Sequence, residues 1–293
     1  MNTRCFGVAL FLVSLFARAE LPAWQAPQGH DNPRLGQVLH TASGEWLEAQ
    51  ELIDRLAGVS HLAVGEKHDN PDHHALQLWL LKQLHARRPQ GALVMEMIGP
   101  EQQDRVRELQ GRQLPADPQL TEQLSWSPGW DWGHYGALVR WGLGYPRKLL
   151  AANLSRDEML AIYRQPRPLE AVYGEEAQAT LARVMAEAHC HELPQERLPA
   201  MLAIQQARDQ RMAQVLGQAP VPAMLLAGAF HVRKDLGMPL HWSPHKEPPV
   251  VLMLVEAGSD LPETFQADFI WITAATVARD YCADLQAAPG TNR

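Results

Sequence analysis

The chain has 293 residues, of which 46% are apolar, and a formal net charge of −7 at pH 7. This apolar content is enough for the core of one large α/β domain, with or without an insert. The acidic balance argues against a role that depends on a basic surface, so we expect no nucleic-acid partner.

The first 19 residues have the organisation of an export signal. Arg4 supplies the positive flank, an apolar core runs from Phe6 to Phe16, and Ala17–Ala19 forms a small-x-small cleavage site. The core has about 11 residues, whereas a membrane-spanning helix needs about 20. We therefore expect a signal peptide over residues 1–19, a single domain over residues 20–293, and an oxidising compartment outside the cytoplasm, the periplasm.

The positions of the three cysteines bear on lipid anchoring and on disulfide formation. Cys5 precedes the apolar core, so it does not lie at the cleavage point, where a lipid anchor would need a cysteine. Cys190 and Cys282 remain in the mature chain, and their separation in the sequence does not decide whether they form a disulfide.

The start of the domain predicts a βαβ unit. Residues 37–46 suggest a small hairpin or strand, residues 48–56 a helix, and His61–Val64 a buried strand. The next helix reaches about residue 88, with Asp69 or Asn70 as its cap and proline in its first turn. A second apolar run at residues 91–97 completes the unit, which favours parallel pairing and a right-handed crossover.

Polar side chains follow several predicted strands. Glu66 and His68 come after the first, Glu96 near the end of the second, Asn153 after a short run from residue 148, and His231 after residues 223–228. The motif Gly-x-x-His therefore closes two strands, at residues 65–68 and 228–231. Because the carboxyl ends of parallel strands lie at one edge of a sheet, we expect these side chains to converge there.

Residues 99–220 are mostly helical or loop, apart from the strand at 148–153. Helices are predicted at residues 156–164, 169–192 and 196–216. Gln205 and Asp209 are four residues apart in the last of these, and we expect the face that they share to be solvated.

Six aromatic residues lie within the 22 residues from Leu124 to Tyr145, in a chain with 7% Phe, Trp and Tyr. They form either a buried plug in the core or a flat apolar wall for a planar ligand.

After this region the strand pattern returns at residues 223–231, 250–255 and 269–273. The sequence thus predicts an α/β fold with a mostly parallel sheet flanked by helices. A large helical insertion, at about residues 99–220, would cover the carboxyl ends of the strands.

Several motifs in this order resemble the ChaN-like haem-binding proteins of the haem-binding uptake/Tiki superfamily. The resemblance extends from about residue 37 to residue 255. The matching stretches are GEKHDNPDHHALQ at 65–77, MEM at 95–97 with Gln102 following, the Trp/Tyr segment at 130–135, AANLSR at 151–156 and GAFHVRKDLGMP at 228–239.

This resemblance implies an exported binding protein, rather than an enzyme, that takes part in haem and iron uptake. In the family a tyrosine holds haem, and haems can pair face to face in a homodimer. The partners implied are haem itself and an outer-membrane haem receptor or a periplasmic haem carrier. A family lipoprotein would have cysteine at the cleavage point, whereas this chain has Ala19–Glu20, so we expect a form without a lipid anchor.

The family's tyrosine ligand does not align with one position of this chain. A phenolate suits ferric haem because it stabilises the oxidised iron. Tyr135 is the first choice, since it lies in the matching aromatic segment with Trp132, and the other candidates are Tyr145, Tyr163 and Tyr173. Arg140 and Arg147 flank that segment and have the side chain that pairs with haem propionates.

A different class of function remains open for the strand-end residues. The wider superfamily contains proteins whose paired Gly-x-x-His motifs resemble a metal-dependent hydrolase centre. By that resemblance His68 and His231 would bind zinc, manganese or iron, and Glu66 or Glu96 would be a ligand or the catalytic base. The alternatives are a structural hydrogen-bonded network at the strand ends, and a protein that docks to a membrane transporter through its apolar helices.

Overall fold

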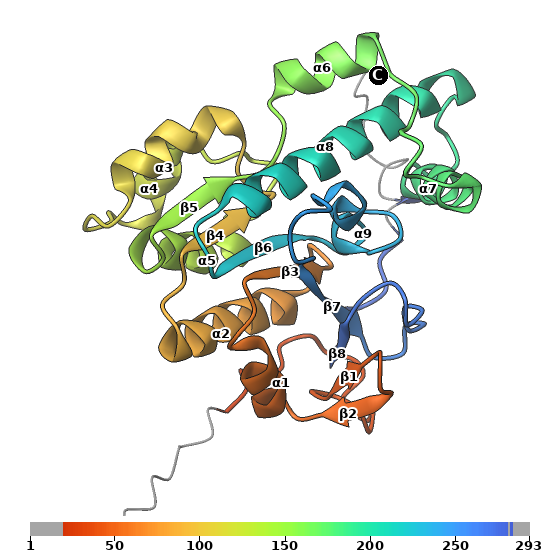
Figure 1. The fold of residues 1–293 in the computed structure, drawn as a ribbon. Coiled ribbons are helices and arrows are strands. Elements are labelled where there is room, and N and C mark those ends of the chain that lie inside the picture. Colours follow the sequence, from red (N-terminus) through yellow and green to blue (C-terminus); the bar gives the residue numbers. More distant parts are fainter. Residues whose placement is uncertain (1–19, 281, 284–293) are drawn as a thin grey trace, which may run out of the picture.

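An eight-stranded sheet forms the centre of the protein in a computed structural model that describes residues 20–280 and 282–283 (Figure 1). The predicted export signal lies outside these residues. The strand order across the sheet is β2-β1-β8-β7-β3-β6-β4-β5. The strands are β1 (Val38–His40), β2 (Glu45–Leu47), β3 (His61–Glu66), β4 (Ala92–Met95), β5 (Lys148–Ala151), β6 (Ala223–Gly228), β7 (Val250–Glu256) and β8 (Phe269–Thr273).

The connections contain helices of very different lengths. The α-helices are α1 (Ala49–Leu56), α2 (Pro71–Arg87), α3 (Gln103–Leu109), α4 (Asp117–Leu124), α5 (Trp132–Gly144), α6 (Arg156–Arg164), α7 (Glu175–Ala188), α8 (Leu198–Gln218) and α9 (Ala229–Val232). Three short 3-10 turns are η1 (Pro100–Gln102), η2 (Gln195–Arg197) and η3 (Met238–His241). None of the helices in the described part of the chain combines the length and apolarity that crossing a membrane requires.

The six strands from β8 to β5 are parallel to one another, and among the named strands the β1–β2 and β1–β8 pairings are antiparallel. This confirms the predicted mostly parallel α/β fold. The central strands are buried on both faces, which explains why their sequences are continuous apolar runs and not alternating patterns.

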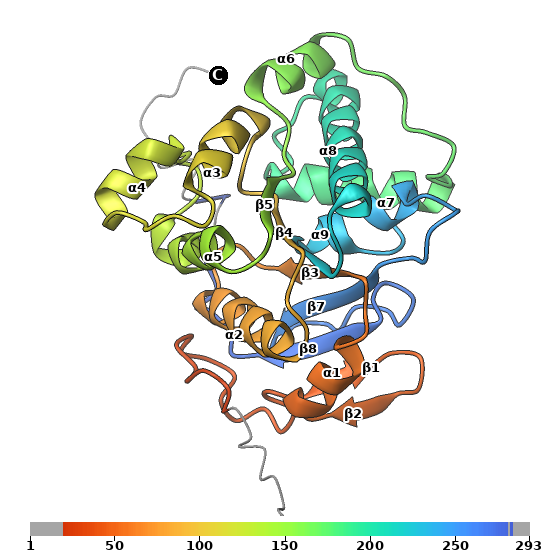
Figure 2. The ribbon, with the colours of Figure 1, turned by 60° about the vertical axis from the view of Figure 1, so that its left-hand side comes forward.

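Helices cover both faces of the sheet (Figure 2). Side chains that alternate along the strands divide into two cores: Val64 and Leu226 pack toward α1, α2 and α5, whereas Ala63 and Leu225 pack toward α8 and α9. The segment 99–220 is itself divided by β5, with α3 to α5 before this strand and α6 to α8 after it.

The structure corrects one helix length. The helix predicted at residues 169–192 begins only at Glu175, after Gly174, and ends at Ala188. Cys190 and His191 then have positive φ angles of 57° and 56°, which an α-helix does not accept. Cys190 is bonded to Cys282 with the Cα atoms 5.5 Å apart, which resolves the pairing that the sequence left open.

Gly65, in the first Gly-x-x-His motif, lies where α9 packs against β3. A Cβ at this position would lie 2.4 Å from Val232 Cγ2 and 3.0 Å from Ala229 Cα. We expect Gly65→Ala to lower the unfolding free energy by about 1–3 kcal/mol because the packed core has no room for the methyl group. Urea denaturation beside Gly58→Ala, at a glycine with open space around it, measures this, and equal losses in the two variants would contradict the packing argument.

Candidate functional site

The carboxyl ends of β3, β4 and β6 bring Glu66, His68, Glu96 and His231 together, and we call these four residues the strand-end cluster. Glu66 is the last residue of β3 and pairs in register with Gly228 at the end of β6. Glu96 follows β4 directly, and its carboxylate accepts a hydrogen bond of 2.8 Å from the Gly228 amide. The predicted convergence of these side chains is therefore present. Asn153 lies nearby, but its side chain donates a hydrogen bond to the backbone carbonyl of Glu96 and so links the segments that follow β4 and β5.

Glu66 is fully buried and accepts from several donors at once. One of its oxygens lies 3.0 Å from His68 Nδ1 and accepts a hydrogen bond of 2.6 Å from the Tyr135 hydroxyl. The other accepts from Gln77 at 2.5 Å and lies 3.3 Å from His74 Nδ1. Burial alone would raise the pKa of Glu66, but the hydrogen bond with His68 and the nearby His74 ring outweigh it and hold the pKa well below its usual value.

His231 lies between two buried carboxylates. Its Nδ1 is 2.6 Å from Asp209 Oδ1, and its Nε2 is 3.4 Å from Glu96 Oε1. Burial opposes the charged imidazole, but Glu96 and Asp209 prevail and raise the pKa of His231 to about 10. The imidazolium in turn keeps the pKa of Glu96 low against the effect of burial. At neutral pH this half of the site is an ion triad of two carboxylates and one cation.

Asp209 corrects an expectation. It was expected on a solvated helix face, yet it is completely buried, and the Gln205 side-chain nitrogen beside it lies 3.0 Å from His231 Nδ1. Helical spacing showed that the two residues share a face, but not that this face of α8 covers the strand ends. Their link to His231 arises only from the fold.

His68 is the part of the cluster that reaches solvent. Its side chain is 43% exposed, and the ring lies edge-on to Trp130 with centroids 5.0 Å apart. Burial would lower the pKa of His68, but the hydrogen bond to Glu66 and the charge of Glu96 raise it. His73 and His74 are both buried: His73 bonds to the Lys67 amide and Thr273, and His74 to the His68 carbonyl.

These side chains do not fit the predicted divalent metal. His231 uses both ring nitrogens on carboxylates, and His68 uses Nδ1 on Glu66. Within residues 20–280 and 282–283, no three His, Cys, Asp or Glu side chains are arranged to hold a metal ion. Three of the four imidazole nitrogens of His68 and His231 already lie against carboxylates, which leaves too few unpaired donors for a metal ion.

The predicted haem residues are dispersed. Tyr135 is buried under the strand-end cluster, whereas Tyr145, 62% exposed, lies at the other end of α5, stacked on Trp141. Trp132 packs on Trp126 in the partly buried aromatic layer. Arg140 donates to Asp117 and to the Pro115 carbonyl.

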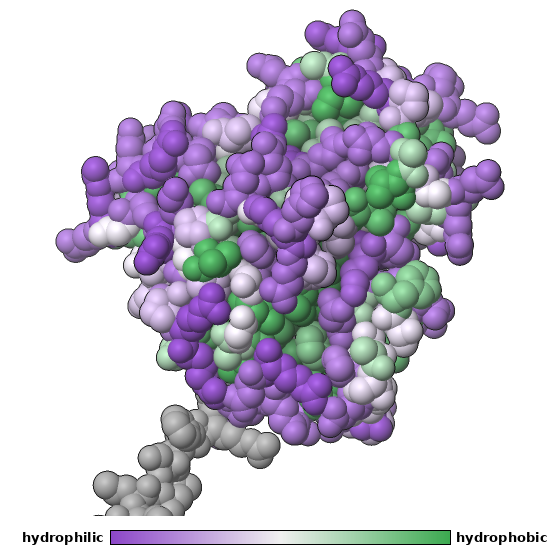
Figure 3. Space-filling model, in the orientation of Figure 1, coloured by the Kyte–Doolittle hydropathy of each residue, from purple (hydrophilic) through white to green (hydrophobic). Residues whose placement is uncertain are grey.

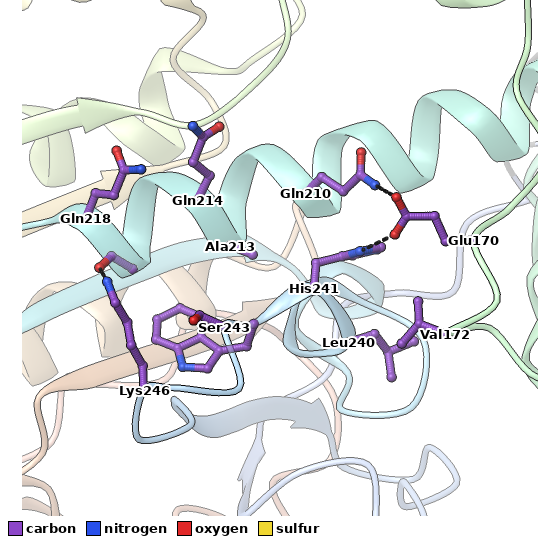
Figure 4. Close-up of a pocket in the computed structure, with 12 residues that line it drawn as sticks. Glu170, Val172, Gln210, Ala213, Gln214, Gln218, Leu240, His241, Ser243 and Lys246 are labelled. Atoms are coloured by element: carbon purple, nitrogen blue, oxygen red, sulfur yellow. Dashed lines mark hydrogen bonds and ion pairs between the residues drawn. The ribbon is translucent and has the colours of Figure 1, made fainter.

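Glu170, Gln210 and His241 line a groove of about 410 Å³ beside α8 (Figure 4). Tyr173 is buried and contacts His241. Its buried hydroxyl is 2.8 Å from His241 Nε2, and Glu170 contacts both His241 and Gln210. Burial, with Asp209 and Glu170 nearby, raises the pKa of Tyr173. Its oxygen is therefore a poor source of phenolate.

Tyr163 has a different environment. It is 37% exposed on α6, a helix without a single buried residue, and Leu160 beside it is 39% exposed. The helix is anchored to α8 on its other side, where Glu158 pairs with Arg211 at 2.6 Å and Arg208 contacts Met159. Figure 3 shows apolar surface bordered by polar side chains at the top of the molecule, where α6 lies.

Comparisons with known proteins agree with this fold. Residues 52–241 match the family described as haem-binding uptake, Tiki superfamily, ChaN. A solved structure titled "Cofacial heme binding to ChaN of Campylobacter jejuni" has a TM-score of 0.69 at 26% identity, over 82% of this chain and 97% of that chain.

Two other solved structures are more distant. An erythromycin esterase, EreC, in an open conformation gives a TM-score of 0.45 at 16% identity, over 83% of each chain. The type III effector HopBA1 gives 0.39 at 12% identity, over 76% of this chain and 91% of that chain. No curated protein matches. Because the family match covers more than half of the sequence, the chain belongs to the ChaN family of haem-binding uptake proteins in the Tiki superfamily.

Proposed function

We propose that this protein is exported and takes part in haem uptake, and that it holds ferric haem through Tyr163 on the outer face of α6. The observation that carries the assignment is the combination of side chains on that face. Arg156, Leu160, Tyr163 and Arg164 follow helical spacing, so they form one stripe that points away from α8.

Each member of the stripe suits one part of the haem. A phenolate ligand stabilises ferric iron, and the Tyr163 hydroxyl has no hydrogen bond to any residue in the described part of the chain. Leu160 provides an apolar contact for the porphyrin face. Arg156 and Arg164 are exposed and carry the guanidinium group that binds carboxylates bidentately, so they are the propionate partners in this proposal.

Tyr135, the first choice from the sequence, fits the iron less well. Its ring is buried and its hydroxyl donates to Glu66 at 2.6 Å. Burial and the Glu66 carboxylate raise the pKa of Tyr135, because a phenolate there would place two negative charges side by side. The Tyr135 hydroxyl instead donates a hydrogen bond that holds the Glu66 carboxylate in place.

A single exposed helix covers only one face of a porphyrin. The Campylobacter jejuni relative is described by its cofacial haem binding. We extend this arrangement to the present chain as a homodimer in which the two α6 surfaces face each other and enclose two haems. Such an interface uses the same surface patch on both copies.

The disulfide between Cys190 and Cys282 supports export, because disulfides persist in oxidising compartments such as the periplasm. In that location the protein would receive haem from, or pass it to, an outer-membrane receptor or a periplasmic carrier. The alternative of a metal-dependent hydrolase is less well supported, since three of the four imidazole nitrogens of His68 and His231 already lie against carboxylates.

Titration with haemin tests the assignment. We expect saturable binding by the mature protein, and at least about tenfold weaker binding by Tyr163→Phe, equivalent to ~1.4 kcal/mol. Tyr145→Phe is the matched control, an exposed tyrosine at the far end of α5 that should bind as the wild type does. Unchanged affinity in Tyr163→Phe would move the ligand away from α6, and no saturable binding by the wild type would end the haem proposal.

A further inference from the structure

The groove of about 410 Å³ beside α8 has the size of a ligand site, since pockets that bind small ligands measure about 300–1,000 Å³ (Figure 4). One wall is formed by Gln210, Gln214 and Gln218, which are four residues apart in the helix and so share one face. Within the described part of the chain, the exposed side chains of Gln214 and Gln218 have no hydrogen-bond partner. Their amides therefore offer free donors and acceptors to a ligand.

The two ends of the groove carry opposite charges. Glu170 lies at the end near Gln210, which donates to its carboxylate at 2.7 Å, and Lys246 lies at the end near Gln218 (Figure 4). The Glu170 side chain is 54% exposed, so its carboxylate has acceptor sites left for a ligand. Lys246 donates one of its protons to the Gly217 carbonyl and keeps two, and its charge offsets the negative end of the α8 dipole.

Neighbouring side chains fix both ends. His241 Nδ1 is 3.4 Å from the Glu170 carboxylate, and Nε2 of the same ring is 2.8 Å from the buried Tyr173 hydroxyl. Burial lowers the pKa of His241, so at neutral pH the ring is uncharged and leaves the charge of Glu170 in place. At the other end the Trp242 indole donates to the Glu247 carbonyl at 2.9 Å, which holds its ring as an apolar wall of the groove.

From this arrangement we infer that the groove binds a short peptide with free ends, with its ammonium group at Glu170 and its carboxylate at Lys246. The stretch of α8 from Gln210 to Gln218 is about 12 Å long at a rise of about 1.5 Å per residue. An extended peptide of three or four residues spans about 10–14 Å. The glutamine amides between the two charges suit the backbone N–H and C=O groups of such a peptide. The site is independent of the haem proposal, which involves none of these residues.

The charges favour this ligand over others of similar size. A phosphate or a simple carboxylate would be repelled by Glu170, a polyamine would be repelled by Lys246, and an uncharged sugar would leave both charges unused. A ligand with one charge of each sign at its two ends satisfies both. Val172 is 44% exposed and lines the groove with Leu240, so apolar side chains of the peptide also find contacts there.

Isothermal titration calorimetry of the mature protein with trialanine at low ionic strength tests this inference. We expect saturable binding of the peptide with free ends. N-acetyl-trialanine lacks the ammonium group and trialanine amide lacks the carboxylate. Each should bind about fivefold more weakly, which is the upper range for an exposed ion pair.

Two variants assign each charge to its end of the groove. Glu170→Gln should bind trialanine about fivefold more weakly and leave the affinity for N-acetyl-trialanine unchanged, because that peptide has no ammonium group to lose. Lys246→Met should give the same pattern with trialanine amide. Glu122→Gln is the matched control: it makes the same change of charge at an exposed position of α4, and all three affinities should stay as in the wild type.

No saturable binding of trialanine at millimolar concentration would overturn the inference, and so would equal affinities for the free and the blocked peptides. A Glu170→Gln variant that weakens all three peptides equally would show that the carboxylate does not recognise the ammonium group, and would overturn it as well. Unchanged midpoints in urea denaturation show that the variants are folded, so that a lost affinity reports the groove itself.

Discussion

His231→Gln is expected to lower the free energy of unfolding by about 3–5 kcal/mol at neutral pH, because it removes the cation from a buried ion triad. The wild-type side chain is 2.6 Å from Asp209 and 3.4 Å from Glu96, and both carboxylates are buried. Glutamine leaves them uncompensated in a medium of low dielectric. Urea denaturation measures the loss, and His245→Gln, at an exposed position, should change stability by less than about 0.5 kcal/mol.

This stabilisation depends on pH in a defined direction. The pKa of His231 is raised from 6.5 to about 10 on folding, so its contribution is fully present below pH 6.5 and is lost as the pH rises toward 10. The difference in stability between wild type and His231→Gln should therefore shrink across this interval. A difference that stays constant from pH 6 to pH 10 would show that His231 is not the buried cation.

Removal of the disulfide should have an effect of similar size. Cys190 and Cys282 are 92 positions apart, and a loop of about this length is expected to contribute about 4–5 kcal/mol through the entropy of the unfolded chain. The double variant Cys190→Ser/Cys282→Ser should lose this stability in urea denaturation. Dithiothreitol should destabilise the wild type to the same extent and leave the double variant unchanged. An unfolding midpoint that the reductant does not shift would mean that the bond makes no global contribution.

The sequence predicted those features of the fold and the site that depend on local patterns and on the parallel order of the strands. Buried strands, the Asn70 cap and the convergence of Glu66, His68, Glu96 and His231 follow from apolar runs, turn residues and parallel topology. The cap was predicted as either Asp69 or Asn70, and Asn70 takes the position because its side chain accepts from the Asp72 amide.

These local patterns do not predict contacts between residues that are far apart in the sequence. Asp209 belongs to an α8 sequence that looks amphipathic in the ordinary way, and only the packing of α8 over β6 brings it to His231. The same limit applies to the tyrosines. Tyr135 was the first choice because it lies in the aromatic segment that resembles the family's Trp/Tyr motif, but most of the aromatic residues in that segment pack in the core. Tyr163 stands alone on α6, and its significance depends on exposure, which composition does not show.

Resonance Raman spectroscopy of the ferric haem complex, with excitation in the phenolate-to-iron charge-transfer band, tests the central claim most directly. Wild type, Tyr135→Phe and Tyr145→Phe should all show the vibrations of an iron-bound phenolate, and Tyr163→Phe should lack them. Phenolate vibrations that persist in Tyr163→Phe and disappear in Tyr135→Phe would contradict the assignment to α6. They would show that the iron binds Tyr135, beside Glu66.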